Sequence, residues 1–123
     1  MYVLDTNAII YYLGGDARAM PTIHNVFAEH VPVYVSAITE VELFSFNRLT
    51  AEDERLLELL IKTLSVIPVD SQIARLAAVT RRSSRLPLPD SIIAATALFT
   101  GSTLLTRNVR DFRKIPSLSL RAV

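Results

Sequence analysis

The stretch that decides the fold is MYVLDTNAII, residues 1–10. Residues 2–5 have the pattern of a short β-strand, and the apolar residues that resume at Ala8 indicate a helix directly after it. The strand ends on a carboxylate, Asp5, which is costly to bury without a partner. In α/β sheets, however, sites form where parallel strands end. The stretch therefore predicts a strand whose last residue lies at the rim of a sheet rather than within the core.

Strand-like and helix-like segments alternate along the rest of the chain. Further strands are predicted at 31–36, 65–69, 102–106 and 117–123. The helices are predicted at 7–13, 20–30, 37–46, 54–64, 72–84 and 91–100. This alternation favours an α/β fold with a mostly parallel central sheet that helices cover on both faces. With 123 residues, no repeat and no linker, the chain 1–123 is expected to form a single domain.

Local signals set the expected helix boundaries. Ser36 and Thr50 are candidate N-caps, and Gly101 is a candidate C-terminal stop. Residues 86–89, LPLP, are expected to form a rigid, extended connector. The next helix would then begin after Asp90, with Asp90 as its N-cap.

Acidic residues lie near the ends of several predicted elements. Asp5 ends the first strand, Asp90 precedes an almost entirely apolar helix, and Asp111 follows the strand at 102–106. On the helix 37–46, the 3.6-residue period directs Glu42 toward an apolar side and Glu40 toward water. Taken singly, each acid also fits a simpler role as a helix cap, a surface residue or a turn residue.

Taken together, these acids predict a negative pocket, because the carboxyl ends of parallel strands meet at one edge of the sheet. Clustered carboxylates repel one another unless protons or cations intervene. The chain has no cysteine and only two histidines, so the available ligands are oxygens, which select Mg²⁺ or Mn²⁺. Such ions activate water and stabilise the leaving oxygen in phosphodiester cleavage.

The charge is unevenly distributed, although the net charge is only +1. Residues 1–70 contain ten acids and four bases, whereas residues 71–123 contain two acids and nine bases. An acidic pocket with a basic flank is typical of nucleases, and a solvated helix face is the simpler alternative for the basic residues. No apolar run approaches the length of a membrane span and no signal peptide is apparent, so a cytoplasmic protein with no membrane partner is expected.

Four segments, in order, carry a resemblance to a known family: DTNAI (5–9), ITEVEL (38–43), LPDSIIAATAL (88–98) and LLTRNVRDF (104–112). They resemble the PIN domain and, more narrowly, the VapC-type toxins of prokaryotic toxin–antitoxin pairs. The resemblance implies a three-layer α/β/α fold and an Mg²⁺- or Mn²⁺-dependent endoribonuclease that cleaves single-stranded or loop regions of RNA.

The resemblance also implies roles for individual residues. The expected catalytic residues are Asp5, Glu42, Asp90 and Asp111, of which Asp5, Asp90 and Asp111 would hold the metal. Some members have an acid at the position of Asn108, whereas this chain has its acid three residues later. The polar residues expected to support the acids are Thr6, Asn7, Thr106 and Asn108.

Three partners follow from the same resemblance: an RNA substrate, a second copy of the chain in a homodimer, and a small antitoxin. We expect the RNA backbone to pass near Arg82, Arg85, Arg107 and Arg110. The antitoxin is expected to contact Tyr11, Tyr12, Leu13 and Phe44. Alternatively these aromatic side chains, and Phe46 with them, belong to the core.

Two other functions are compatible with parts of the sequence. Haloacid-dehalogenase-type phosphotransfer enzymes also begin with an apolar strand that ends in Asp, but their second Asp would fall at Asn7. The other alternative is a catalytically silent PIN-like module that only binds RNA or protein.

Overall fold

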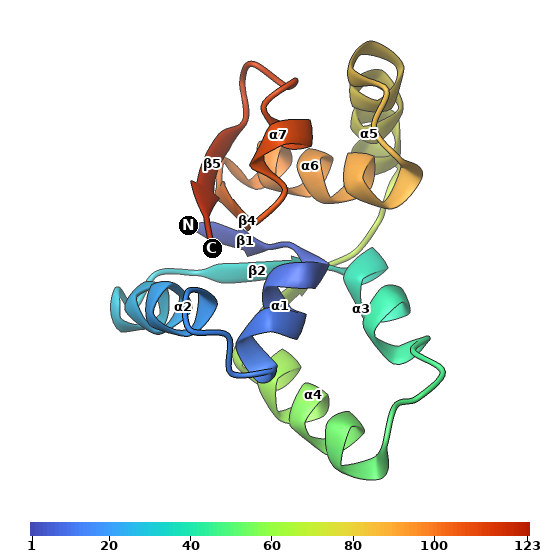
Figure 1. The fold of residues 1–123 in the computed structure, drawn as a ribbon. Coiled ribbons are helices and arrows are strands. Elements are labelled where there is room, and N and C mark those ends of the chain that lie inside the picture. The colour runs from blue at the N-terminus through green and yellow to red at the C-terminus, as the bar shows by residue number, and fades with distance from the viewer.

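The computed structural model describes all residues 1–123 and arranges them in three layers (Figure 1). The middle layer is a five-stranded sheet in the order β3-β2-β1-β4-β5, with every neighbouring pair parallel. The strands are β1 (Tyr2–Leu4), β2 (Val33–Ser36), β3 (Ser65–Ile67), β4 (Thr103–Thr106) and β5 (Ser119–Ala122). The predicted α/β/α fold with a parallel sheet is confirmed.

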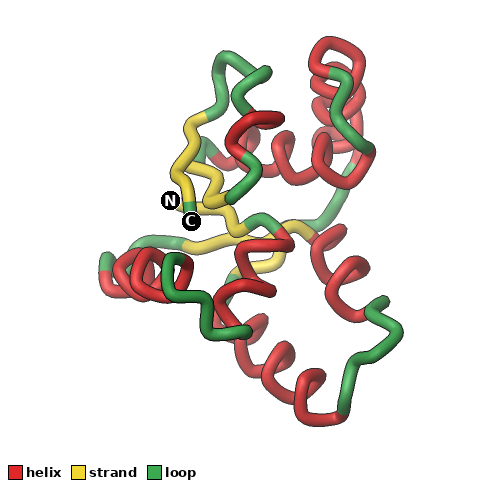
Figure 2. Tube along the Cα trace, in the orientation of Figure 1, coloured by secondary structure: helices red, strands yellow, loops and turns green.

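Helices cover both faces of this sheet (Figure 1). One side carries α1 (Thr6–Leu13), α2 (Ala19–Ala28), α3 (Ala37–Phe44) and α4 (Ala51–Thr63). The other side carries α5 (Ser71–Ser84), α6 (Leu88–Thr100) and α7 (Val109–Phe112). Figure 2 shows the loop between α3 and α4 standing away from the sheet. None of these helices combines the length and hydrophobicity that crossing a membrane requires.

Alternating side chains of the central strands build the two halves of the core. Val3 and Leu104 pack with residues of α6 and α7, whereas Leu4 and Leu105 pack with residues of α1 to α4. All four are at most 1% exposed. Successive strand residues point to opposite faces, so a sheet covered on both sides needs apolar residues at consecutive positions. Burying each such side chain contributes about 1.5–3 kcal/mol.

Three predicted helix boundaries are confirmed by their capping contacts. The Ser36 hydroxyl accepts a hydrogen bond from the Ile38 N–H at the start of α3. Thr50 and Asp53 form a reciprocal capping box at the start of α4. Gly101 ends α6 with a φ of 65°, a conformation that favours glycine.

Several boundaries differ from the prediction, among them the end of α3 at Phe44 rather than at 46, and α7 was not predicted. Strand β3 ends at Ile67 rather than at 69, because Pro68 has no N–H to donate. Helix α6 begins at Leu88, so the extended connector is shorter than 86–89 and Asp90 lies inside the first helical turn. Pro89 is compatible with that turn because its missing N–H would have no helical partner there. Helix α2 occupies Ala19–Ala28 rather than 20–30.

Candidate active site

The register of β1 and β4 brings Asp5 against Thr106. Leu4 pairs with Leu105, and the Asp5 N–H donates to the Leu105 carbonyl at 3.1 Å. The Thr106 hydroxyl donates to Asp5 Oδ2 at 2.8 Å, and both residues are buried. The Asp5 side chain accepts no capping hydrogen bond at α1. Asp5 therefore stands at the N-cap position of α1, but its carboxylate is held as an acceptor for Thr106 at the sheet edge rather than by a capping hydrogen bond.

Glu42 reaches the same edge from α3. The Thr6 hydroxyl donates to Glu42 Oε1 at 2.7 Å and lies 3.1 Å from the Thr39 hydroxyl. Glu40 is half-buried, as Glu42 is, so the predicted contrast in exposure is wrong, but Glu40 makes no side-chain hydrogen bond. Asn7 is exposed and also makes no side-chain hydrogen bond. Of the predicted supporting residues Thr6 and Asn7, only Thr6 contacts an acid.

The turn after β4 connects Asp5 with Asp111. The Asn108 N–H donates to the Thr106 hydroxyl at 2.9 Å, and that hydroxyl donates onward to Asp5. The Asn108 side-chain amide donates to Asp111 Oδ2 at 3.1 Å. Lys114 Nζ lies 3.9 Å from Asp111 Oδ1. Two acids that are far apart in the sequence are therefore oriented by one short hydrogen-bonded turn.

Asp90 differs from the other three acids because its half-buried carboxylate accepts no hydrogen bond and does not cap α6. Burial, followed by the negative charges of Asp5, Glu42 and Asp111, raises the pKa of Asp90 to about 6. Burial also raises the pKa of Asp5, against the opposing hydrogen bond from Thr106. The charges of the other three acids act on Asp90, so the four carboxylates form one negative pocket.

This pocket fits a hydrated hard cation. The atoms that would ligate the cation are carboxylate oxygens, and hydroxyl and amide groups hydrogen-bond to these carboxylates. Mg²⁺ and Mn²⁺ require such oxygen ligands. No three carboxylates or imidazoles are placed to ligate one ion directly. Mg²⁺ usually keeps several of its waters and uses only one or two carboxylates, so direct ligation by three is not needed.

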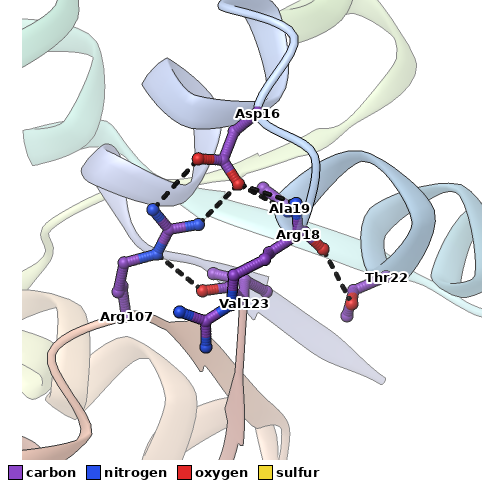
Figure 3. Close-up of polar contacts among 6 residues, drawn as sticks. All are labelled: Asp16, Arg18, Ala19, Thr22, Arg107 and Val123. Carbon is purple, nitrogen blue, oxygen red and sulfur yellow. Dashed lines mark hydrogen bonds and ion pairs between the residues drawn. The ribbon is translucent and has the colours of Figure 1, made fainter.

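Arg107, which we expected to lie near the RNA backbone, is engaged in contacts within the protein. Its guanidinium donates to both carboxylate oxygens of Asp16, at 3.1 and 2.7 Å, and to the Val123 carbonyl at 2.7 Å (Figure 3). It also lies 3.9 Å above the Tyr11 ring. Asp16 in turn accepts from the Ala19 N–H at 2.9 Å at the start of α2. We call this arrangement the Asp16–Arg107 clasp; it ties the turn after β4 to α2 and β5.

The remaining predicted RNA contacts are exposed and make no ion pair. Arg82 and Arg85 line an open hollow of about 440 Å³ at the end of α5, together with Arg81. Arg110 is exposed on α7. Arg85 ends α5 with a φ of 55°, a left-handed conformation that costs a non-glycine residue about 1–3 kcal/mol.

An apolar groove of about 240 Å³ lies between α1, α3 and α4. Of the four expected antitoxin contacts, only Leu13 lines it. Tyr11 lies under Arg107, Tyr12 packs edge-on against His24 and Phe27, and Phe44 packs on the core. Phe46 is 61% exposed, so the alternative that it belongs to the core is wrong. The lining residues are Ile10, Leu13, Gly14, Leu43, Phe46, Leu49, Asp53, Leu56 and Leu57.

Comparisons with known proteins agree with this fold. A toxin–antitoxin complex from Klebsiella pneumoniae is 28% identical, with a TM-score of 0.81 over 96% of this chain and 95% of that chain. DNA-bound VapBC from Salmonella typhimurium is 25% identical, with a TM-score of 0.81 over 98% and 96%. VapBC2 from Rickettsia felis, bound to a promoter DNA fragment, shares the fold at 22% identity, with a TM-score of 0.85 over 99% and 98%. No curated protein matches the chain. The PIN domain family model matches residues 2–118, and the chain therefore belongs to the PIN domain family.

Proposed function

We propose that this protein is the toxin of a toxin–antitoxin pair and a divalent-metal-dependent endoribonuclease. The observation that carries the proposal is the pocket of four carboxylates, in which Asp90 has no hydrogen-bond partner and a pKa raised toward neutrality. An uncompensated group of like charges is unfavourable for the folded protein, and a functional cation would relieve it. The similar toxin–antitoxin complexes support the biological role.

Each acid has a role that its contacts favour. Asp5, Asp90 and Asp111 would hold the cation, one or two of them directly and the rest through its bound waters, with Thr106 orienting Asp5 and Asn108 orienting Asp111. When bound, the cation would polarise the scissile phosphate and lower the pKa of the attacking water. Glu42 accepts from Thr6 through Oε1, which leaves Oε2 available to accept a proton from that water.

Exposed basic side chains on α5 and α7 favour a polyanionic substrate. Arg82 and Arg85 line the hollow at the end of α5, and Arg110 projects from α7, the helix that carries Asp111. None of the three makes an ion pair that would have to break when a phosphate binds. These arginines would neutralise backbone charge without reading sequence.

The apolar groove between α1, α3 and α4 is the surface that would accept the antitoxin. Seven of its nine lining residues are hydrophobic, which suits one face of an amphipathic segment. Phe46 lines both this groove and a second hollow that Glu42 lines, so a segment lying in the groove would pass near Glu42. We infer a homodimer from the resemblance to the VapC-type toxins.

The decisive test is cleavage of single-stranded RNA by the wild type in Mn²⁺, compared with Asp90→Asn. Removing one carboxylate from the cation site should lower the rate by about 100-fold or more. Glu40→Gln is the matched control, since Glu40 lies on the same helix as Glu42 and makes no hydrogen bond. A wild type that binds RNA but never cleaves it would favour the silent-module alternative. Hydrolysis of a small phosphoester without RNA cleavage would favour phosphotransfer.

A further inference from the structure

A second hollow, of about 350 Å³, lies against the acid pocket on the loop between α3 and α4. It is lined by Glu42, Ser45, Phe46, Asn47 and Arg48. Figure 2 shows that this loop stands away from the sheet. Glu42 is the one of the four acids that lines the hollow.

Three of the four loop side chains of this hollow make no polar contact within the protein, whereas the Ser45 hydroxyl donates to the Val41 carbonyl. Phe46 is 61% exposed, although Phe44, two residues earlier, packs on the core. Asn47 and Arg48 are exposed and make no side-chain hydrogen bond or ion pair. A single exposed apolar residue is common, but here an aromatic face, a free amide and a free guanidinium surround one hollow.

We propose that this hollow binds a nucleobase of the RNA substrate, stacked on the Phe46 ring. Exposed aromatic rings are the usual platform for unpaired bases, because every base has a π-face. The Asn47 amide has both donors and an acceptor with which to contact a base edge. Arg48 would contact the adjoining phosphate. The inference rests on the proposed function, since RNA is the ligand that the acid pocket would cleave.

The composition of the hollow separates it from the apolar groove on the other side of Phe46. Only one of its five lining residues is hydrophobic, whereas seven of the nine in the groove are hydrophobic. An apolar protein segment therefore fits the groove, and a ligand with one flat face and several polar edges fits the hollow. Because Glu42 forms a wall of the hollow, a base bound there places its own phosphate beside the acids. Stacking on Phe46 would thus hold the nucleotide next to the cleaved bond.

Fluorescence provides the direct test, because the chain contains no tryptophan. Phe46→Trp, in an Asp90→Asn background that prevents cleavage, would carry the only indole. A short single-stranded RNA should quench its emission, and an abasic oligonucleotide of the same length should not. Phe99→Trp is the matched control, since Phe99 is 51% exposed at the far end of α6 from Asp90, and its emission should not change.

Affinity measurements with the same two oligonucleotides separate stacking from backbone contacts. Phe46→Leu should weaken RNA binding by roughly 5- to 100-fold, whereas Phe46→Tyr, which keeps the ring, should bind like the wild type. Arg48→Ala should weaken binding of both oligonucleotides and reduce the salt dependence by about one phosphate contact.

The outcomes that would overturn the inference are distinct from failure of the proposed function. Wild-type RNA affinity in Phe46→Leu, or equal quenching by the abasic oligonucleotide, would remove the nucleobase from the hollow. Loss of antitoxin binding alone would assign Phe46 to the protein partner instead. A wild type that cleaves no RNA would overturn the proposed function, whatever Phe46 does.

Discussion

Two carboxylates in this protein, Asp16 and Asp90, lie in surroundings that shift their pKa values in opposite directions. Arg107 and the backbone N–H groups of Ala19 and Arg18 hold the pKa of Asp16 well below its usual range. Asp90 has no such partner, and burial and neighbouring acids raise its pKa to about 6. The first acid stabilises the fold through the Asp16–Arg107 clasp. The second opposes folding where it stands, which is typical of a group retained for function.

The largest expected effect concerns activity and would sharpen this contrast. Asp90→Asn should lower RNA cleavage by about 100-fold or more, because it removes a ligand of the cation. The same change should raise the stability of the metal-free protein, by about 1 kcal/mol once solvent screening of this half-buried group is allowed for. Cleavage rates and thermal melts of one preparation check both; a variant that is both inactive and less stable would contradict the account.

Breaking the Asp16–Arg107 clasp should lower the stability of the protein instead. Asp16→Asn keeps an oxygen for capping α2 but leaves the Arg107 guanidinium without its counter-charge, so the melting temperature should fall. The exposed pair of Glu52 and Arg55 supplies the control, and Glu52→Gln should leave the melting temperature almost unchanged. If the two variants melt alike, the clasp contributes no more than a surface ion pair.

Thr106→Val should affect both properties moderately. The variant is nearly isosteric but removes the hydroxyl that donates to Asp5 and accepts from Asn108. Because these groups are buried, stability should fall by about 1–3 kcal/mol. Cleavage should fall by roughly 10- to 100-fold, as for other residues that orient metal ligands. Thr103→Val is the control, because Thr103 is half-buried at the start of the same strand and its hydroxyl contacts only Ser119. An unchanged rate in Thr106→Val would exclude the orienting role.

The smallest expected effect is the dependence of stability on pH. The folded-state pKa of Asp90 is about 6, above the ordinary value of 3.8, so the folded protein binds more protons between these values. Metal-free wild type should therefore become more stable as the pH falls from 7.5 to 5, and lose this gain as the pH rises through 6. Asp90→Asn should flatten the curve in that window. A wild-type curve that falls toward pH 5 would show that Asp90 is not under strain.

The sequence predicted the positions that strand geometry determines. Asp5 and Thr106 each lie at the end of a short apolar strand, and neighbouring parallel strands bring such residues together. Asp90 was placed near the site, although its helix begins three residues earlier than predicted, because both prolines are tolerated at a helix start.

The contacts that depend on tertiary packing were not predictable. Arg107 and Asp16 are 91 residues apart, and no local signal distinguishes Arg107 from Arg82. Phe46 was assigned to a helix face, but α3 ends at Phe44 and the helical period no longer applies beyond it. For the same reason the sequence did not single out Asn47, which lies in the loop that follows.

The most direct test of the account is a thermal melt of wild type and Asp90→Asn at increasing Mn²⁺ concentration. If the four acids form a cation site, Mn²⁺ binds the folded state alone and raises the wild-type melting temperature progressively. Asp90→Asn should start from a higher melting temperature and lose most of the metal-dependent gain. A wild type indifferent to Mn²⁺, with an Asp90→Asn variant that is no more stable than the wild type, would contradict the account.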